Sequence, residues 1–284
     1  MKITVKENKL NFIRYPGGKQ KILNYILPFL PSREEIRGNY IEPFLGSGAV
    51  FFAIDPKNAI LADINRELID LFHGIRAYPR DVWKIYKSFP QDKEGYYRIR
   101  NTKIENDDLA FKAAKLLYLN RTCFKGMWRQ NSNGTFNVGY GGQSRRWVIN
   151  EELLIKVSER LKNSVLLWSD FESVIDKSKE GDFIFLDPPY KPGGRELKHA
   201  HYAYQKFLFS DYQRLSNSLK KATHRKVNWA MTISSHQDII ELFKEYYIYL
   251  IPKGTGSSPG ILRNNSGEVL ICNYKMEVYN ERFF

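Results

Sequence analysis

An acid, two prolines and a tyrosine follow a short apolar run at 183–186. The carboxylate of Asp187 and the carbonyl of Pro188 could each accept one N–H from the exocyclic amine of a nucleobase. That amine is a poor nucleophile because its lone pair is delocalised into the ring, and two acceptors favour a tetrahedral nitrogen whose lone pair faces an electrophile. Pro189 stiffens the turn, and Tyr190 could stack on a base that has left the duplex.

A glycine-rich stretch, FLGSG at 44–48, stands between an expected strand and an expected helix. Gly46 and Gly48 would permit a tight turn and the close approach of a ligand to the backbone. Position 51 is Phe51, so the GxGxxG pattern is missing and a NAD or FAD site is disfavoured. A purely structural turn is the alternative.

Two further segments could serve an adenosine-type cofactor. Asp63 lies 15 residues beyond Gly48, at the end of a second expected strand, where an acid can accept hydrogen bonds from both ribose hydroxyls. Asp63 could instead cap the following helix, a role that also suits Asn65. The segment RYPGGK at 14–19 places a cation and an aromatic ring beside a turn, with a plain turn into a helix as the alternative.

These residues need elements that bring them together. Apolar runs that predict strands occur at 40–41, 59–64, 165–168, 183–186, 229–234, 246–251 and 268–274. Segments with helical periodicity lie between several of them. We therefore expect an α/β fold with a mostly parallel, Rossmann-like sheet and helices on both faces, in which ligands bind at the carboxyl edge of the strands.

The region 76–150 has a different character. It contains an expected helix at 107–120 and then a polar stretch in which Asn133-Gly134 predicts the turn of an exposed β-hairpin. The basic and aromatic residues that interleave there are Lys125, Arg129, Arg145, Arg146, Phe124, Trp128, Phe136 and Tyr140. Such a mixture suits phosphates and base edges, although a merely solvated hairpin fits equally. We expect one sheet domain formed by 1–75 and 151–284, with 76–150 inserted into it.

Composition narrows the partner class. The net charge of +13 favours a polyanion, with nucleic acid the first candidate. No apolar run near 18 residues and no surface-lying basic helix is evident, so we expect a protein without membrane contact. Cys123 and Cys272 lack metal-binding spacing, which predicts no metal site, and the N-terminus lacks a signal peptide's apolar core, which predicts a cytoplasmic protein.

Taken together, the motifs resemble the Dam-like (D12 class, α-group) DNA adenine-N6 methyltransferases, which use S-adenosyl-L-methionine. The resemblance extends over nearly the whole chain and includes RYPGGK, IEPFLGSGAVFF, LADINRELI, NRTCFKGMWRQNSNGTFNVGYG, DPPY, FSDYQRL and ILRNNSGEVLICNY, in this order. It implies a site-specific methyltransferase that flips an adenine out of double-stranded DNA. It also implies that 1–75 and 151–284 form the catalytic domain and that the insertion 76–150 is a DNA target-recognition domain. A cognate restriction endonuclease is a candidate partner, and a monomer or weak dimer is expected.

The resemblance also implies roles for individual residues. Those expected around the cofactor are Tyr15, Lys19, Glu42, Phe44, Gly46, Gly48, Asp63, Asp170, Phe171 and Asp187, of which Asp170 and Phe171 would clamp its adenine. Arg14, Lys125 and Arg129 fall where family members touch DNA. The family's best-known GATC readers carry Lys and Asn at the first two of these positions, so GATC specificity is not predicted here.

Three alternatives stay open at this point. One is methylation of cytosine N4, since a motif of the DPPY type can serve either amine. Another is an inactive, sequence-specific DNA-binding protein on the same scaffold. The third is an RNA methyltransferase, which a groove-reading hairpin disfavours because the major groove of A-form RNA is hard to enter. A further hypothesis is that the segment 191–204 forms a flap that becomes ordered when DNA binds.

Overall fold

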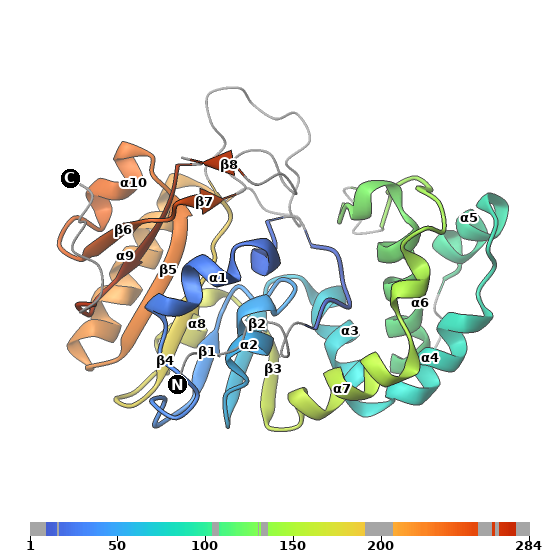
Figure 1. The fold of residues 1–284 in the computed structure, drawn as a ribbon, viewed down its shortest axis with the longest axis horizontal. Helices are drawn as coiled ribbons and strands as arrows, with labels where there is room; N and C mark the ends of the chain where they lie inside the picture. The colour runs from blue at the N-terminus through green and yellow to red at the C-terminus, as the bar shows by residue number, and fades with distance from the viewer. Residues whose placement is uncertain are drawn as a thin grey trace.

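The computed structural model describes residues 10–15, 17–103, 108–129, 131, 136–190, 207–254, 263–264 and 267–276. Its centre is a seven-stranded sheet with the order β3-β2-β1-β4-β5-β9-β6 (Figure 1). The strands are β1 (Tyr40–Glu42), β2 (Ala59–Asp63), β3 (Ser164–Trp168), β4 (Phe183–Leu186), β5 (Asn228–Ser234), β6 (Tyr247–Leu250) and β9 (Glu268–Cys272). The pairings among the first five are parallel, and β9 runs antiparallel between β5 and β6. The predicted α/β fold with a mostly parallel sheet is therefore confirmed.

The sheet is covered on both faces, which explains why its central strands are apolar throughout. In β4 the side chains alternate between the two hydrophobic clusters: Phe183 and Phe185 pack into one, and Ile184 and Leu186 into the other. All four are buried. Because a strand buried on both faces has no polar side, its sequence is a continuous apolar run.

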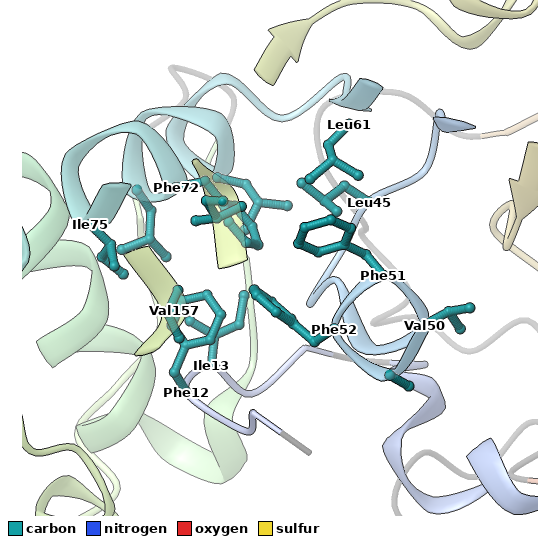
Figure 2. Packing of buried hydrophobic residues seen from close by; sticks show 14 of the residues in the cluster. Phe12, Ile13, Leu45, Val50, Phe51, Phe52, Leu61, Phe72, Ile75 and Val157 are labelled. Carbon is teal, nitrogen blue, oxygen red and sulfur yellow. The ribbon is translucent and has the colours of Figure 1, made fainter. Parts of the chain in front are cut away.

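One face carries α1 (Leu23–Ile26), α2 (Ala49–Ile54) and α3 (Arg66–Ala77), together with the N-terminal segment. Phe12 packs edge-on against two rings, at centroid distances of 5.8 Å from Phe52 and 5.4 Å from Phe72. Figure 2 shows these rings beside Leu45 and Leu61. The loop that follows β1 is thus anchored by its helix in a tightly packed aromatic core.

The other face is covered by α8 (Phe171–Ile175), α9 (Phe209–His224) and α10 (Gln237–Leu242). The apolar residues of α9, among them Leu215 and Leu219, are fully buried against β5 and its neighbours. Trp229 on β5 fills this layer and donates its indole N–H to the Thr223 hydroxyl at 2.9 Å. This layer fixes where α9 begins relative to the end of β4.

The chain between α3 and α7 (Glu151–Leu161) forms α4 (Pro79–Ser88), α5 (Lys93–Asn101) and α6 (Leu109–Thr122), which extend away from the sheet (Figure 1). The predicted helix at 107–120 corresponds to α6, which begins after its cap Asp108. Short 3₁₀ turns occur at Lys19–Lys21, Leu27–Phe29, Phe124–Gly126 and Arg146–Val148, and β7 (Lys253–Gly254) pairs with β8 (Arg263–Asn264). Residues of this helical region belong to the same hydrophobic cluster as one face of the sheet, and its separate-domain status stays a prediction.

The expected exposed hairpin takes a less regular form. Cys123 and Tyr140 form an isolated antiparallel bridge, and the described part of the segment between them contains no longer ladder. Trp128 and Phe136 are only 4% and 5% exposed, so the expectation of an exposed hairpin is wrong for these two rings, which pack into the core. The turn predicted at Asn133-Gly134 and the flap predicted at 191–204 lie outside the described residues.

Candidate active site

Four of the sequence motifs meet at the carboxyl edge of the sheet. β1 lies between β2 and β4, so the loop after Glu42 has Asp63 on one side and Asp187 on the other. The 3₁₀ turn that begins at Lys19 approaches from the helical layer above this edge. Parallel strands thereby bring together residues that are far apart in sequence.

Asp187 is held by a cation and a hydroxyl. Lys19 Nζ lies 2.6 Å from Asp187 Oδ1, and Thr232 Oγ1 donates to the same oxygen at 2.9 Å. Burial raises the pKa of Asp187, while Lys19 and Thr232 act to lower it. Both contacts fall on Oδ1, and no described residue donates a hydrogen bond to Oδ2. Lys19 and Thr232 therefore hold the carboxylate through one of its two oxygens.

The rest of the DPPY turn is fixed by hydrogen bonds from the neighbouring elements. The Tyr190 hydroxyl donates to Glu268 Oε2 at 3.3 Å, and the Tyr212 hydroxyl donates to the Pro189 carbonyl. Lys19 Nζ lies 4.7 Å from the centroid of the Tyr190 ring. Burial raises the pKa of Tyr190 well above its usual value, so the hydroxyl keeps its proton and stays a donor. The ring of Tyr190 is thereby set in one orientation.

The glycine loop approaches Asp63 through its backbone. The N–H of Gly46 donates to Asp63 Oδ2 at 3.0 Å. Gly46 and Gly48 have φ values of +48° and +66°, in the left-handed region that favours glycine. A Cβ at Gly46 would lie 3.2 Å from Cδ1 of Tyr15, so the ring of Tyr15 covers the loop closely. The loop thus has the backbone conformation that its sequence predicts.

Asp63 and Glu42 form an acidic wall beside this loop. Asn65, rather than Asp63, caps α3 by accepting from Leu68 N at 3.3 Å, while Asp63 accepts from Asn65 N at 2.9 Å. Burial raises the pKa of Asp63 to about 6 and that of Glu42 to about 8, and the Asp187 carboxylate adds to the rise at Glu42. Tyr40 donates to Glu42 Oε2 at 2.7 Å. Two buried acids that are costly to ionise would be stabilised by a cationic ligand.

Asp170 and Phe171 stand at the start of α8, after the end of β3. Asp170 caps this helix by accepting from Glu172 N at 3.0 Å. Phe171 stacks on Phe44 of the glycine loop, with ring centroids 5.3 Å apart and planes inclined by 27°. The predicted adenine clamp therefore borders the glycine loop.

Arg14 and Lys125, the first two predicted DNA-reading residues, belong to neighbouring segments. The backbone of Arg14 is clamped by Asn120, whose side chain accepts from Arg14 N at 2.8 Å and donates to its carbonyl at 2.6 Å. Gly126, at φ +65°, allows the Arg14 side chain to lie against the loop, because a Cβ there would overlap it. Burial and the nearby Arg145 lower the pKa of Arg14. Lys125 is exposed, next to Gly126.

The remaining predicted DNA contacts divide into three cases. Arg129 is half-buried and donates to Asn137 Oδ1 at 2.8 Å, and Arg145 is exposed. Arg146 is 0% exposed, and its guanidinium donates to the carbonyls of Pro90 at 2.8 Å and Tyr86 at 2.9 Å. The prediction that Arg146 contacts DNA is therefore wrong, because this side chain ties α4 to the segment before α7.

Sequence reasoning missed several residues that support the site, namely Thr232, Glu268, Tyr212 and Arg214. Thr232 could have been found from the register of the parallel strands β4 and β5. Leu186 pairs with Met231, so the residues that follow them, Asp187 and Thr232, lie side by side. Glu268 was detectable as an acid at the start of an otherwise apolar strand, where it is 0% exposed. Tyr212 and Arg214 lie within the motif FSDYQRL, but the motif gave them no role, because their contacts depend on how α9 is rotated against the sheet.

The parallel sheet, the glycine loop after β1 and the acid that ends β2 define a Rossmann-like methyltransferase, in which the DPPY turn follows β4. The family model described as D12 class N6 adenine-specific DNA methyltransferase matches residues 15–254, and the chain belongs to this family. It is a DNA methyltransferase that acts on adenine N6.

Named relatives agree with this assignment. Type II methyltransferase M1.LlaDCHI of Lactococcus lactis subsp. cremoris is 29% identical, covering 95% of this chain and 98% of its own length. Type II methyltransferase M.MjaIII of Methanocaldococcus jannaschii is 31% identical, covering 93% and 98%. The DNA N-6-adenine-methyltransferase of Escherichia phage P1 is 33% identical, covering 84% of this chain and 32% of its own. Among the described residues, none of the helices has the length and apolar character that crossing a membrane requires.

Proposed function

We propose that the chain transfers a methyl group from S-adenosylmethionine to N6 of an adenine that has been extruded from duplex DNA. The observation that carries this proposal is the state of Asp187, whose Oδ1 is engaged by Lys19 and Thr232 while no described residue donates a hydrogen bond to Oδ2. A carboxylate held in this way is oriented before the substrate arrives, which is the requirement for electrostatic stabilisation of a transition state.

The residues around the glycine loop fit the proposed cofactor. S-adenosylmethionine supplies an electrophilic methyl group on a positively charged sulfur. Glu42 and Asp63 provide buried carboxylates for its cationic and hydroxyl groups, and the ring of Tyr15 packs closely on the glycine loop at Gly46. Phe44 and Phe171 offer apolar surface for a purine.

The DPPY turn would hold the target base. Asp187 Oδ2 and the Pro188 carbonyl accept the two N–H groups of the amine and draw its lone pair out of conjugation. Tyr190 stacks on the extruded ring, in the orientation set by Glu268. After transfer the amine nitrogen carries an extra proton, and Asp187 is the carboxylate placed to accept it.

DNA recognition is assigned to Arg14, Lys125, Arg129 and Arg145. The exposed Lys125 and Arg145 suit phosphates, and the half-buried Arg14 and Arg129, held by Asn120 and Asn137, suit base edges. Two relatives are named Type II methyltransferases. By that analogy we propose a restriction-modification role with a cognate endonuclease, and a chain that acts as a monomer or weak dimer.

Replacing the catalytic acid tests this proposal. We expect Asp187→Ala to abolish methyl transfer while changing cofactor affinity less than about tenfold, because Asp187 acts on the amine in the transition state. Transfer of labelled methyl groups to duplex DNA and calorimetric binding of S-adenosylmethionine measure the two effects. Asp176→Asn, at the other end of α8, is the control and keeps full activity. Unchanged turnover in Asp187→Ala would contradict the proposed role of Asp187 in methyl transfer.

A further inference from the structure

Arg214, near the start of α9, contacts three acids. Its guanidinium lies 2.8 Å from Asp170 Oδ1, 2.9 Å from Glu172 Oε2 and 3.1 Å from Asp211 Oδ1. Its Nε also donates to Glu172 Oε2, at 3.1 Å, so this arginine uses two nitrogens on one carboxylate. An arginine fork held at several points has a defined position even though the side chain is 41% exposed.

The same guanidinium covers an aromatic ring. Arg214 Cζ lies 4.8 Å from the centroid of Phe171, whose ring is 5% exposed and stacks on Phe44. The ring of Phe207 packs at 5.9 Å from each of these two phenylalanines. Arg214 therefore restrains both the charged and the aromatic member of the pair Asp170 and Phe171.

The contacts also set which oxygen of Asp170 is presented. Arg214 Nη2 and the N–H of Glu172 both donate to Oδ1, and no described residue donates to Oδ2. An oxygen with open lone pairs beside an aromatic surface is suited to accept an N–H from the amino group of a purine. Without Arg214, the carboxylate of Asp170 would lose its only cationic partner among the described residues, although the helix cap would remain.

We propose that Arg214 is a positioning residue for the cofactor: it orients Asp170 and Phe171 so that the site selects the amino-bearing adenine of S-adenosylmethionine. This inference rests on the proposed function, because it assumes that the cofactor's adenine binds at Asp170 and Phe171. It adds a residue of α9 to the cofactor site, and it gives that residue a role in selecting the base of the cofactor.

Tyr212, two residues before Arg214 in α9, contacts the catalytic turn. Tyr212 donates its hydroxyl to the Pro189 carbonyl, within the DPPY turn. The start of α9 thus supports the catalytic turn through Tyr212 and the cofactor site through Arg214. Loss of Arg214 should therefore raise the KM for S-adenosylmethionine more than it lowers kcat, whereas Tyr212→Phe should mainly lower kcat.

The chain offers a matched control in Arg225, at the other end of α9. Its guanidinium donates to the carbonyls of Ser178 at 2.9 Å and Ile175 at 2.8 Å, so it too links α9 to the α8 region. These contacts lie at the far end of α8 from Asp170. Arg225→Met removes a comparable link between the two helices without touching the proposed cofactor site.

The test compares two ligands that differ at the purine amine, S-adenosylhomocysteine and S-inosylhomocysteine, by calorimetry. Wild type should bind the adenosyl ligand more tightly. Arg214→Met should weaken its binding about tenfold and remove most of the discrimination, because Asp170 loses the charged hydrogen bond that orients it. Arg214→Lys should restore binding only in part, since an ammonium cannot reproduce the fork. Arg225→Met should keep the discrimination of wild type.

The outcomes separate this inference from the proposed function. If Arg214→Met, Arg225→Met and wild type all discriminate equally between the adenosyl and the inosyl ligand, the proposed role of Arg214 is overturned. If Arg214→Met does not fold, undiminished discrimination in the milder Arg214→Lys overturns it instead. Suppose that Phe171→Ala binds the adenosyl ligand more weakly while both Arg214 variants bind it as wild type does. This result contradicts the positioning role of Arg214 and leaves the proposed function standing. Failure of wild type to bind either ligand contradicts the proposed cofactor itself.

Discussion

Asp187 and Asp170 are oriented in the same way at the level of single atoms. In each carboxylate, Oδ1 accepts hydrogen bonds from a basic side chain and from a second donor. In neither case does a described residue donate to Oδ2. One oxygen therefore fixes the side chain and the other is left for a ligand. The arrangement suits two adenines, one in the substrate and one in the cofactor, which present the same amino group.

The buried acid Glu42 has a consequence for stability in the absence of ligand. Its pKa rises from 4.5 to about 8, so the folded protein holds a proton that the unfolded chain releases. The contribution of this proton to the free energy of unfolding is fully present below pH 4.5 and is lost as the pH rises through 8. We expect the free energy of unfolding to fall more steeply between these values in wild type than in Glu42→Gln, by a few kcal/mol in total.

Urea unfolding of both proteins at a series of pH values measures this difference. Asp63, whose pKa rises to about 6, contributes in the same direction at lower pH and is common to both proteins. Parallel curves for wild type and Glu42→Gln would mean that Glu42 is ionised at little cost, contrary to its 2% exposure.

The residues of the site were predictable where a motif carried them. Asp63 and Asp187 each follow an apolar run, and the carboxyl ends of parallel strands must meet at one edge. Glu268 was detectable only as an acid at the start of an apolar strand, and the role of Arg214 was not predictable, because its contacts depend on a helix rotation that no local pattern encodes. The DNA contact predicted for Arg146 was wrong because a basic residue in a polar stretch is expected to be exposed. This guanidinium is buried instead and donates hydrogen bonds to backbone carbonyls of α4 and of the residues that follow it.

Among the elements, the segment from Cys123 to Tyr140 differs most from expectation. The pattern of alternating aromatic and basic residues predicts an exposed ribbon, yet Trp128 and Phe136 are buried in the same cluster as α6. Burying these rings anchors the segment and leaves the basic residues Lys125 and Arg129 toward its surface. The sheet strands were easier to predict, since burial on both faces requires continuous apolar runs.

A glycine in this segment offers a test of how it positions Arg14. Gly126→Ala places a methyl group where the Arg14 side chain lies, at a backbone conformation that costs alanine about 1 kcal/mol. We expect reduced discrimination between DNA sites that differ by one base pair, with unchanged affinity for S-adenosylmethionine. Ratios of kcat/KM on such sites measure the effect.

Gly142→Ala is the matched control for this experiment. Gly142 also has a positive φ, of +102°, but no atom lies within 4 Å of its added Cβ. Its replacement therefore imposes backbone strain without displacing a side chain. Equal loss of discrimination in both variants would argue that strain in the segment, and not the position of Arg14, controls site choice.

At the scale of the whole molecule, the net charge of +13 governs the encounter with DNA. Each phosphate contact releases counterions, so the logarithm of the association constant should fall linearly with the logarithm of salt concentration. We expect Arg145→Ala to reduce the magnitude of this slope by about 0.9, as the loss of one phosphate contact. Fluorescence anisotropy on labelled duplexes measures it.

Lys244, at the end of α10, is the control for the salt dependence. This lysine is exposed and ion-pairs with Glu241 of α10, and Figure 1 shows α10 on the opposite side of the molecule from α6. Lys244→Ala removes the same unit of charge without removing a proposed DNA contact. An equal change of slope in both variants would show that total charge, and not the surface around Arg145, sets the affinity.

The identity of the methylated base is the most direct test of the whole account. Duplex DNA containing many sequences is incubated with the protein and S-adenosylmethionine carrying a deuterated methyl group, and the digested nucleosides are analysed by mass spectrometry. We expect labelled N6-methyldeoxyadenosine with wild type and none with Asp187→Ala. Labelled N4-methyldeoxycytidine in its place, or equal labelling of adenine by both proteins, would contradict it.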